Sequence, residues 1–71
     1  MKENSTIKTG DIKLIVFIDG NQEKDKVAKI IAVDSYGILI ELWNEQTNVS
    51  LGAPSFFLPW HKVNKIKEVK L

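Results

Sequence analysis

Short apolar runs that each end at a turn signal constrain this chain more than any other feature of its sequence. The runs are IKLIVFI at 12–18, VAKIIAV at 27–33 and ILIELW at 38–43, and they stop at DGN, DSYG and NEQTN. They are rich in β-branched and aromatic residues, and runs of this composition between turn signals are typical of strands. The pattern therefore predicts an all-β chain.

The third run also shows which side of its strand is apolar. One set of alternating positions contains only aliphatic residues, namely Ile38, Ile40 and Leu42. The other set is mixed, namely Leu39, Glu41 and Trp43. Because successive side chains of a strand point to opposite faces, the first set can face one side of the strand and the second set the other. Core or interface is the default position for Trp43.

The remaining segments predict two further strands and a loop. The segment NQEKDK at 21–26 is expected to be a charged loop. A fourth strand is expected over 49–58, bent or interrupted at Gly-Ala-Pro 52–54. It should end at Pro59, because proline has no amide hydrogen to donate to a ladder.

The C-terminal segment does not follow the period of a strand. Val63, Ile66 and Val69 recur at every third residue, which favours a turn of 3₁₀ helix. We expect this turn at 59–64 and a last short strand at 65–69. Five short strands in so small a chain predict a strongly bent antiparallel barrel. A 3₁₀ turn before the last strand favours the SH3-like and Sm-like forms over the OB form.

The size of the chain makes its core marginal. With 71 residues it is read as one domain, 1–71, whose first ten residues form a loosely ordered tail. A domain of this size buries only about 60% of the surface that it exposes when unfolded. The chain has no cysteine, which excludes disulfides and thiolate metal sites, and it has a single histidine. Self-association is the remaining route to further burial.

Charge and hydropathy limit the surroundings of the protein. The formal net charge is +1, but residues 58–71 hold four lysines against one glutamate. This basic end can face phosphates or can simply be a solvated strand edge. No arginine is present, so bidentate phosphate contacts are not available. The longest apolar run, 14–18, is too short to span a bilayer, and we expect a soluble cytoplasmic protein without a membrane partner.

Two stretches carry a resemblance to a known family. They are VAKIIAVDSYGILIE and FFLPWHKVNKI, and they resemble the two motif regions of the Sm-like family, which includes bacterial RNA chaperones. In the first, Asp34 is followed two residues later by the aromatic Tyr36. In the second, His61 is followed two residues later by an apolar residue. The tyrosine and lysine usual before this histidine are replaced by Pro59 and Trp60. The resemblance covers about 12–69.

This resemblance implies a homo-oligomeric ring that binds single-stranded, U-rich RNA near its pore. The fourth strand of one subunit would pair with the fifth strand of the next. Tyr36 would stack on a base, His61 would donate a hydrogen bond, and Lys62 would meet a phosphate. Asn64 could read a base edge.

Each of these residues also has a purely structural interpretation. Tyr36 could cover the end of the barrel, and His61 could bond a backbone carbonyl. Lys62 could be a solvated lysine, and the turn alone is a sufficient reason for Asn64. Asp34 is expected to organise its turn. The residues expected in packing or in a subunit interface are Trp60, Phe57, Leu58 and Ile66.

Catalysis has no support in the sequence. It lacks a second histidine, a phosphate-binding glycine loop and a nucleophile elbow. We therefore expect neither an enzyme nor a cofactor or metal site. The alternative to an RNA-binding ring is an SH3-like or Sm-like module that binds protein or only itself. Such a module could come from a phage or a mobile element.

Overall fold

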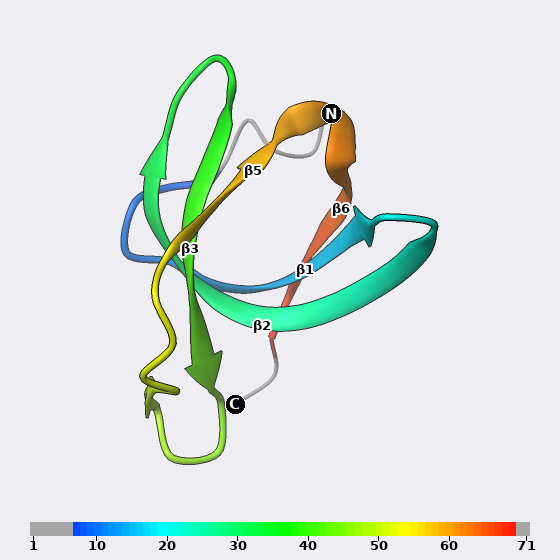
Figure 1. The fold of residues 1–71 in the computed structure, drawn as a ribbon. Coiled ribbons are helices and arrows are strands. Elements are labelled where there is room, and N and C mark those ends of the chain that lie inside the picture. The colour runs from blue at the N-terminus through cyan, green and yellow to red at the C-terminus, as the bar shows by residue number, and fades with distance from the viewer. Residues whose placement is uncertain (1–6, 70–71) are drawn as a thin grey trace.

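The computed structural model describes residues 7–69 of the chain as a single bent antiparallel sheet (Figure 1). Its elements are β1 (Ile12–Asp19), β2 (Gln22–Val33), β3 (Gly37–Asn44), β4 (Val49–Ser50), β5 (Phe56–Pro59), the 3₁₀ turn η2 (Trp60–Lys62) and β6 (Val63–Glu68). The predicted all-β class and the 3₁₀ turn before the last strand are confirmed. The sheet has six strands because the expected fourth strand is divided into β4 and β5.

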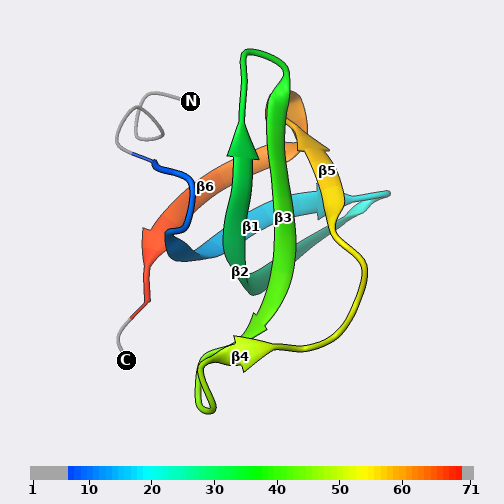
Figure 2. The ribbon, with the colours of Figure 1, turned by 90° about the vertical axis from the view of Figure 1, so that its left-hand side faces the viewer.

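Strand β2 gives the sheet its bend. Its first half pairs with β1 and its second half pairs with β3, and the register with β3 shifts between Ile30 and Ala32. Such a bulge adds a residue on one side and bends the strand. The resulting order is β4-β3-β2-β1-β6, and β5 pairs with the other part of β3 (Figure 2). The sheet therefore curls into a partly open barrel.

The core lies inside this curl. Its buried residues are Ile15, Phe17, Ala28, Ile30, Ile38, Ile40, Leu58 and Val63. Ile38 and Ile40, which share one set of alternating positions in β3, are fully buried. Ile7 packs against the same cluster, and the Gly10 amide donates to the Ile30 carbonyl at 2.7 Å. Of the expected N-terminal tail, residues 1–6 lie outside the described part of the chain.

The prediction of a loop at 21–26 is wrong. Residues 22–26 are exposed but form the first half of β2, in continuous register with β1. The two strands are joined by the two-residue turn Gly20-Asn21, and Gly20 has a φ of +64°. Short hairpin turns of this kind use glycine where φ is positive. The tight turn places β1 and β2 side by side, and their backbone hydrogen bonds form the first half of β2. No apolar alternation is needed for this part of the strand.

The C-terminal segment differs from its prediction in one respect. The last strand begins at Val63 rather than at residue 65, and the turn is correspondingly shorter than 59–64. The β1–β6 register passes from Val16↔Lys65 to Phe17↔Val63, so Asn64 is an additional residue on β6. This bulge lets Val63 and Ile66 both pack on the core three residues apart. The period of three thus reflects a bulged strand.

Candidate functional site

The turn between β2 and β3 is built around Asp34. Its Oδ1 accepts hydrogen bonds from the amides of Tyr36 at 2.7 Å and Gly37 at 3.0 Å. The Asp34 amide donates to the Gly37 carbonyl at 3.0 Å. Aspartate commonly fixes turns in this way, by bonding backbone amides two and three residues ahead. The structural role expected of Asp34 is confirmed.

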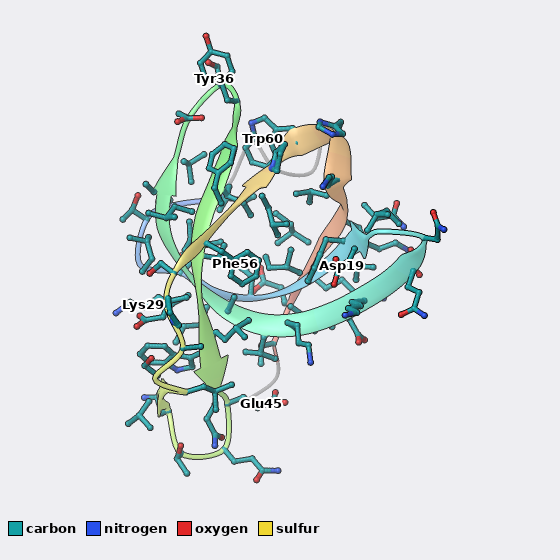
Figure 3. All side chains as sticks on the ribbon, viewed as in Figure 1. Asp19, Lys29, Tyr36, Glu45, Phe56 and Trp60 are labelled. Carbon is teal, nitrogen blue, oxygen red and sulfur yellow. The ribbon has the colours of Figure 1, made fainter. Side chains whose placement is uncertain are left out.

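Tyr36 stands at the outer end of this turn. Its side chain is 78% exposed, the largest exposure among the large apolar residues of the described chain. Figure 3 shows the ring projecting from the tip of the hairpin, away from the interior of the sheet. The ring therefore does not close the barrel and is accessible to a ligand.

Trp60 ties the 3₁₀ turn η2 to the Tyr36 turn. Its amide donates to the Tyr36 carbonyl at 3.1 Å, and its indole Nε1 donates to the Asp34 carbonyl at 2.9 Å. Its ring is half-buried and packs against the core cluster. Pro59 precedes it with a φ of −62°, which directs the chain out of β5. The sequence-based preference for Trp60 as a packing residue is consistent with these contacts.

A close approach of β5 fixes the base of the same hairpin. A Cβ atom on Gly37 would lie 2.2 Å from the Leu58 carbonyl oxygen and 2.7 Å from the Phe57 ring. Only glycine fits this position, because the added Cβ would also meet backbone atoms of β5, which cannot move aside as a flexible side chain can. The Phe57 ring thus lies over Gly37, directly beside the Tyr36 turn, and remains 46% exposed.

Three of the four residues predicted to bind RNA belong to two adjoining turns. Tyr36 is on the β2–β3 turn, and His61 and Lys62 are exposed on η2. The Trp60 hydrogen bonds join these turns directly. Lys62 lies on the side of η2 that faces the β1–β2 hairpin, where its charge helps to lower the pKa of Asp19.

Asn64 is not part of this group. Its amide group donates a hydrogen bond to the Glu23 carboxylate on β2. Asn64 therefore links the bulge of β6 to the β1–β2 hairpin. Of the residues expected in packing or in a subunit interface, Leu58 is buried and Ile66 packs on the core. Phe57 is exposed.

A groove between the β1–β2 hairpin and β5 was missed by the sequence analysis. It has a volume of about 390 Å³, and its lining includes Phe17, Asp19, Lys24, Lys26, Phe56 and Lys62. Lys24 is opposite Phe17 in the ladder and Lys26 is opposite Ile15. Residues opposite each other point to the same face, so both lysines leave β2 on its core side. Reading 21–26 as a loop concealed this alternation.

The electrostatics of the groove are dominated by cations. Lys24 Nζ lies 2.8 Å from Asp19 Oδ2, and this hydrogen bond with the charge of Lys24 holds the pKa of Asp19 below its usual value. The Asp19 charge is thus already balanced by one lysine. Lys26 and Lys62 remain as additional positive charges at the groove.

Within residues 7–69, no cluster of three or more histidine, cysteine, aspartate or glutamate side chains is arranged to hold a metal ion. The same residues include no helix with the length and apolar character needed to cross a membrane.

Comparison of the chain with known protein families, with curated proteins and with solved structures found no significant match in any of the three. Its function is therefore argued from its own residues.

Proposed function

We propose that this protein is a non-catalytic, self-associating β-barrel that binds single-stranded RNA, with U-rich RNA as the preferred ligand. The observation that carries the proposal is Tyr36, a 78% exposed ring on a turn fixed by hydrogen bonds to Asp34 and Trp60. An exposed aromatic ring on a turn whose backbone is fixed offers a base a stacking surface without reorganisation of the chain.

The basic residues beside Tyr36 supply the second part of the ligand chemistry. His61 and Lys62 are exposed on the turn that Trp60 joins to the Tyr36 turn. A lysine next to a stacked base can meet the phosphate of the same or the following nucleotide. His61 has two ring nitrogens that can hydrogen-bond a base edge or a phosphate oxygen. Phe57, half-exposed over Gly37, is a candidate for a second stacked base.

The two ends of the sheet support the proposed self-association. Among the described residues, β5 pairs only with β3 and β6 pairs only with β1, so each strand has one free edge. Free edges are templates for pairing with another chain. We propose that β5 of one subunit pairs with β6 of the next, which would close a ring and repeat the Tyr36 site in every subunit.

The RNA-binding part is tested with a labelled oligouridine and the variants Tyr36→Ala and His61→Ala. A stacked base contributes about 1–3 kcal/mol, so Tyr36→Ala should weaken binding roughly 5- to 150-fold. His61→Ala should weaken it less. Because both side chains are exposed, thermal unfolding should stay close to that of the parent.

A matched control is Leu51→Ala, which removes another exposed apolar side chain, on the segment that follows β4. It should leave oligouridine binding unchanged. Equal affinities of the parent and the Tyr36→Ala variant would contradict the stacking role. Affinity that is insensitive to salt would contradict the phosphate contacts.

The free edges also favour a second candidate function, a protein-interaction module. A partner could add a strand to β5 or β6 by backbone hydrogen bonds, without any RNA. In that case oligouridine should not bind at any salt concentration, and substitutions on the β5 edge should change the oligomeric state or partner binding.

A further inference from the structure

We propose that the groove between the β1–β2 hairpin and β5 is a binding site for a nucleotide phosphate, either a free nucleotide or one nucleotide of an RNA chain. Only the RNA source of this ligand rests on the proposed function. The groove shares Lys62 with the surface around Tyr36 and adds Lys24 and Lys26 of β2 to it.

The first argument is the position of the lysines. Lys24 and Lys26 leave β2 on the same face as Phe17 and Ile15, which is the face of the sheet that covers the core. A barrel wall usually places apolar residues on that face. The lysines therefore stand at the open side of the barrel, with aromatic and aliphatic side chains behind them.

The second argument is charge. The groove has three lysines, namely Lys24, Lys26 and Lys62, against the single carboxylate of Asp19. Asp19 is already bonded to Lys24 at 2.8 Å. The unbalanced charge is therefore positive, and an ammonium group is a common partner of phosphate. An anionic ligand complements this groove, whereas a cation would be repelled.

The third argument is the apolar wall. Phe17 and Phe56, which both line the groove, contact each other on its core side with ring centroids 6.3 Å apart and a tilt of 58°. A volume of about 390 Å³ lies in the range of sites for small ligands. Aromatic walls combined with lysines suit a ligand that has both a flat ring and a phosphate group, which is the composition of a nucleotide. Figure 3 labels Phe56 at the start of β5 and Asp19 at the end of β1, and both residues line the groove.

Continuity with the Tyr36 surface favours a nucleotide over an acidic peptide. Lys62 lines the groove and also belongs to η2, the turn that Trp60 joins to Tyr36. Pro59 lines the groove too, and it pairs with Gly37 at the base of the Tyr36 turn. An RNA chain that stacks on Tyr36 could thus pass η2 and place another nucleotide between Lys62 and Lys26.

The test measures binding of uridine monophosphate, ribose 5-phosphate and inorganic phosphate by amide chemical shifts and calorimetry. We expect uridine monophosphate to bind most tightly and to shift amides of β1, β2, β5 and η2. The double variant Lys26→Met/Lys62→Met should weaken it by about tenfold or more for each lysine, as for a lost charge-assisted hydrogen bond. Both lysines are exposed, so the fold should be retained.

The matched control is Lys65→Met/Lys67→Met, which removes the same charge from exposed positions on β6 outside the groove. It should change the affinity less than twofold. Equal binding of inorganic phosphate and uridine monophosphate would overturn the proposal, because the apolar wall would then contribute nothing. No binding of any of the three ligands would overturn it as well, and so would an acidic peptide that binds at these lysines in preference to the nucleotide.

The two proposals fail separately. If Tyr36→Ala abolishes oligouridine binding but the single variant Lys26→Met, which leaves Lys62 in place, changes neither oligouridine nor uridine monophosphate binding, the groove proposal is wrong and the Tyr36 site stands. If uridine monophosphate binds in the groove while oligouridine does not bind, the ligand is a free nucleotide and the RNA function is wrong. Loss of affinity for both ligands in Lys26→Met supports the RNA source.

Discussion

The β2–β3 turn and the β1–β2 hairpin lie at opposite ends of β2, and they are stabilised by different interactions. The first is fixed by the Asp34 carboxylate and by both hydrogen bonds of Trp60. The second is held by its ladder, the Lys24–Asp19 ion pair and the Asn64–Glu23 contact. One end displays an exposed aromatic ring on a turn with a fixed backbone, and the other leaves charged side chains at an open groove. A fixed backbone turn thus carries the proposed stacking site, and the proposed phosphate site is distinguished by its charge.

The largest difference in stability between the two ends of β2 should appear when the glycine of each turn is replaced. Gly37→Ala would place a Cβ against backbone atoms of β5 and should lower the free energy of unfolding by about 3 kcal/mol. Gly20→Ala meets no atom within 4 Å and costs only the strain of a φ of +64°, about 1 kcal/mol. Urea unfolding of both variants measures the difference. Equal decreases in the free energy of unfolding would mean that β5 does not pack closely against Gly37.

A smaller effect should come from the tryptophans. Trp60→Phe removes the donor to the Asp34 carbonyl and should cost about 1–2 kcal/mol. The control, Trp43→Phe, removes a longer bond, 3.2 Å rather than 2.9 Å, to Asn48 Oδ1 and should cost less than about 0.5 kcal/mol. Thermal unfolding can rank the two variants. The reverse order would show that the Trp60 bond does not fix the turn.

The smallest effect should come from Asp19, and it depends on pH. Its pKa in the folded protein lies below the ordinary value of 3.8, because Lys24 stabilises the carboxylate. The contribution to stability is therefore present above pH 3.8 and is lost as the pH falls through the folded-state pKa. Asp19→Asn should make unfolding less dependent on pH in this acid range. Lys24→Met should do the same, and an unchanged profile in either variant would contradict the ion pair.

The sequence predicts the parts of this fold that depend on apolar alternation. The strand faces of β3 follow from Ile38 and Ile40, and the turns follow from Gly20 and Asp34. The first half of β2 could not be predicted in this way, because its charged residues are exposed and its strand forms by pairing with β1. The bulge at Asn64 was missed for a related reason, since a bulge and a 3₁₀ turn both give a spacing of three.

In the candidate site too, local sequence patterns predict some features, whereas others depend on contacts between distant residues. Tyr36 and the turn that carries His61 and Lys62 could be identified from short motifs, because these residues are close in sequence to turn signals. The bond from Trp60 to the Asp34 carbonyl joins residues 26 positions apart, and no local pattern indicates it. The groove depends on the register of β1 with β2 and on the path of β5, so its lysines were not recognised as neighbours of Phe17.

The central claim is that the barrel self-associates and binds RNA. A native mass spectrum of the protein mixed with a short oligouridine tests both parts in one measurement. The account predicts a closed oligomer of defined subunit number that carries the oligonucleotide and loses it when Tyr36 is replaced by alanine. A monomer with no bound oligonucleotide would contradict the account.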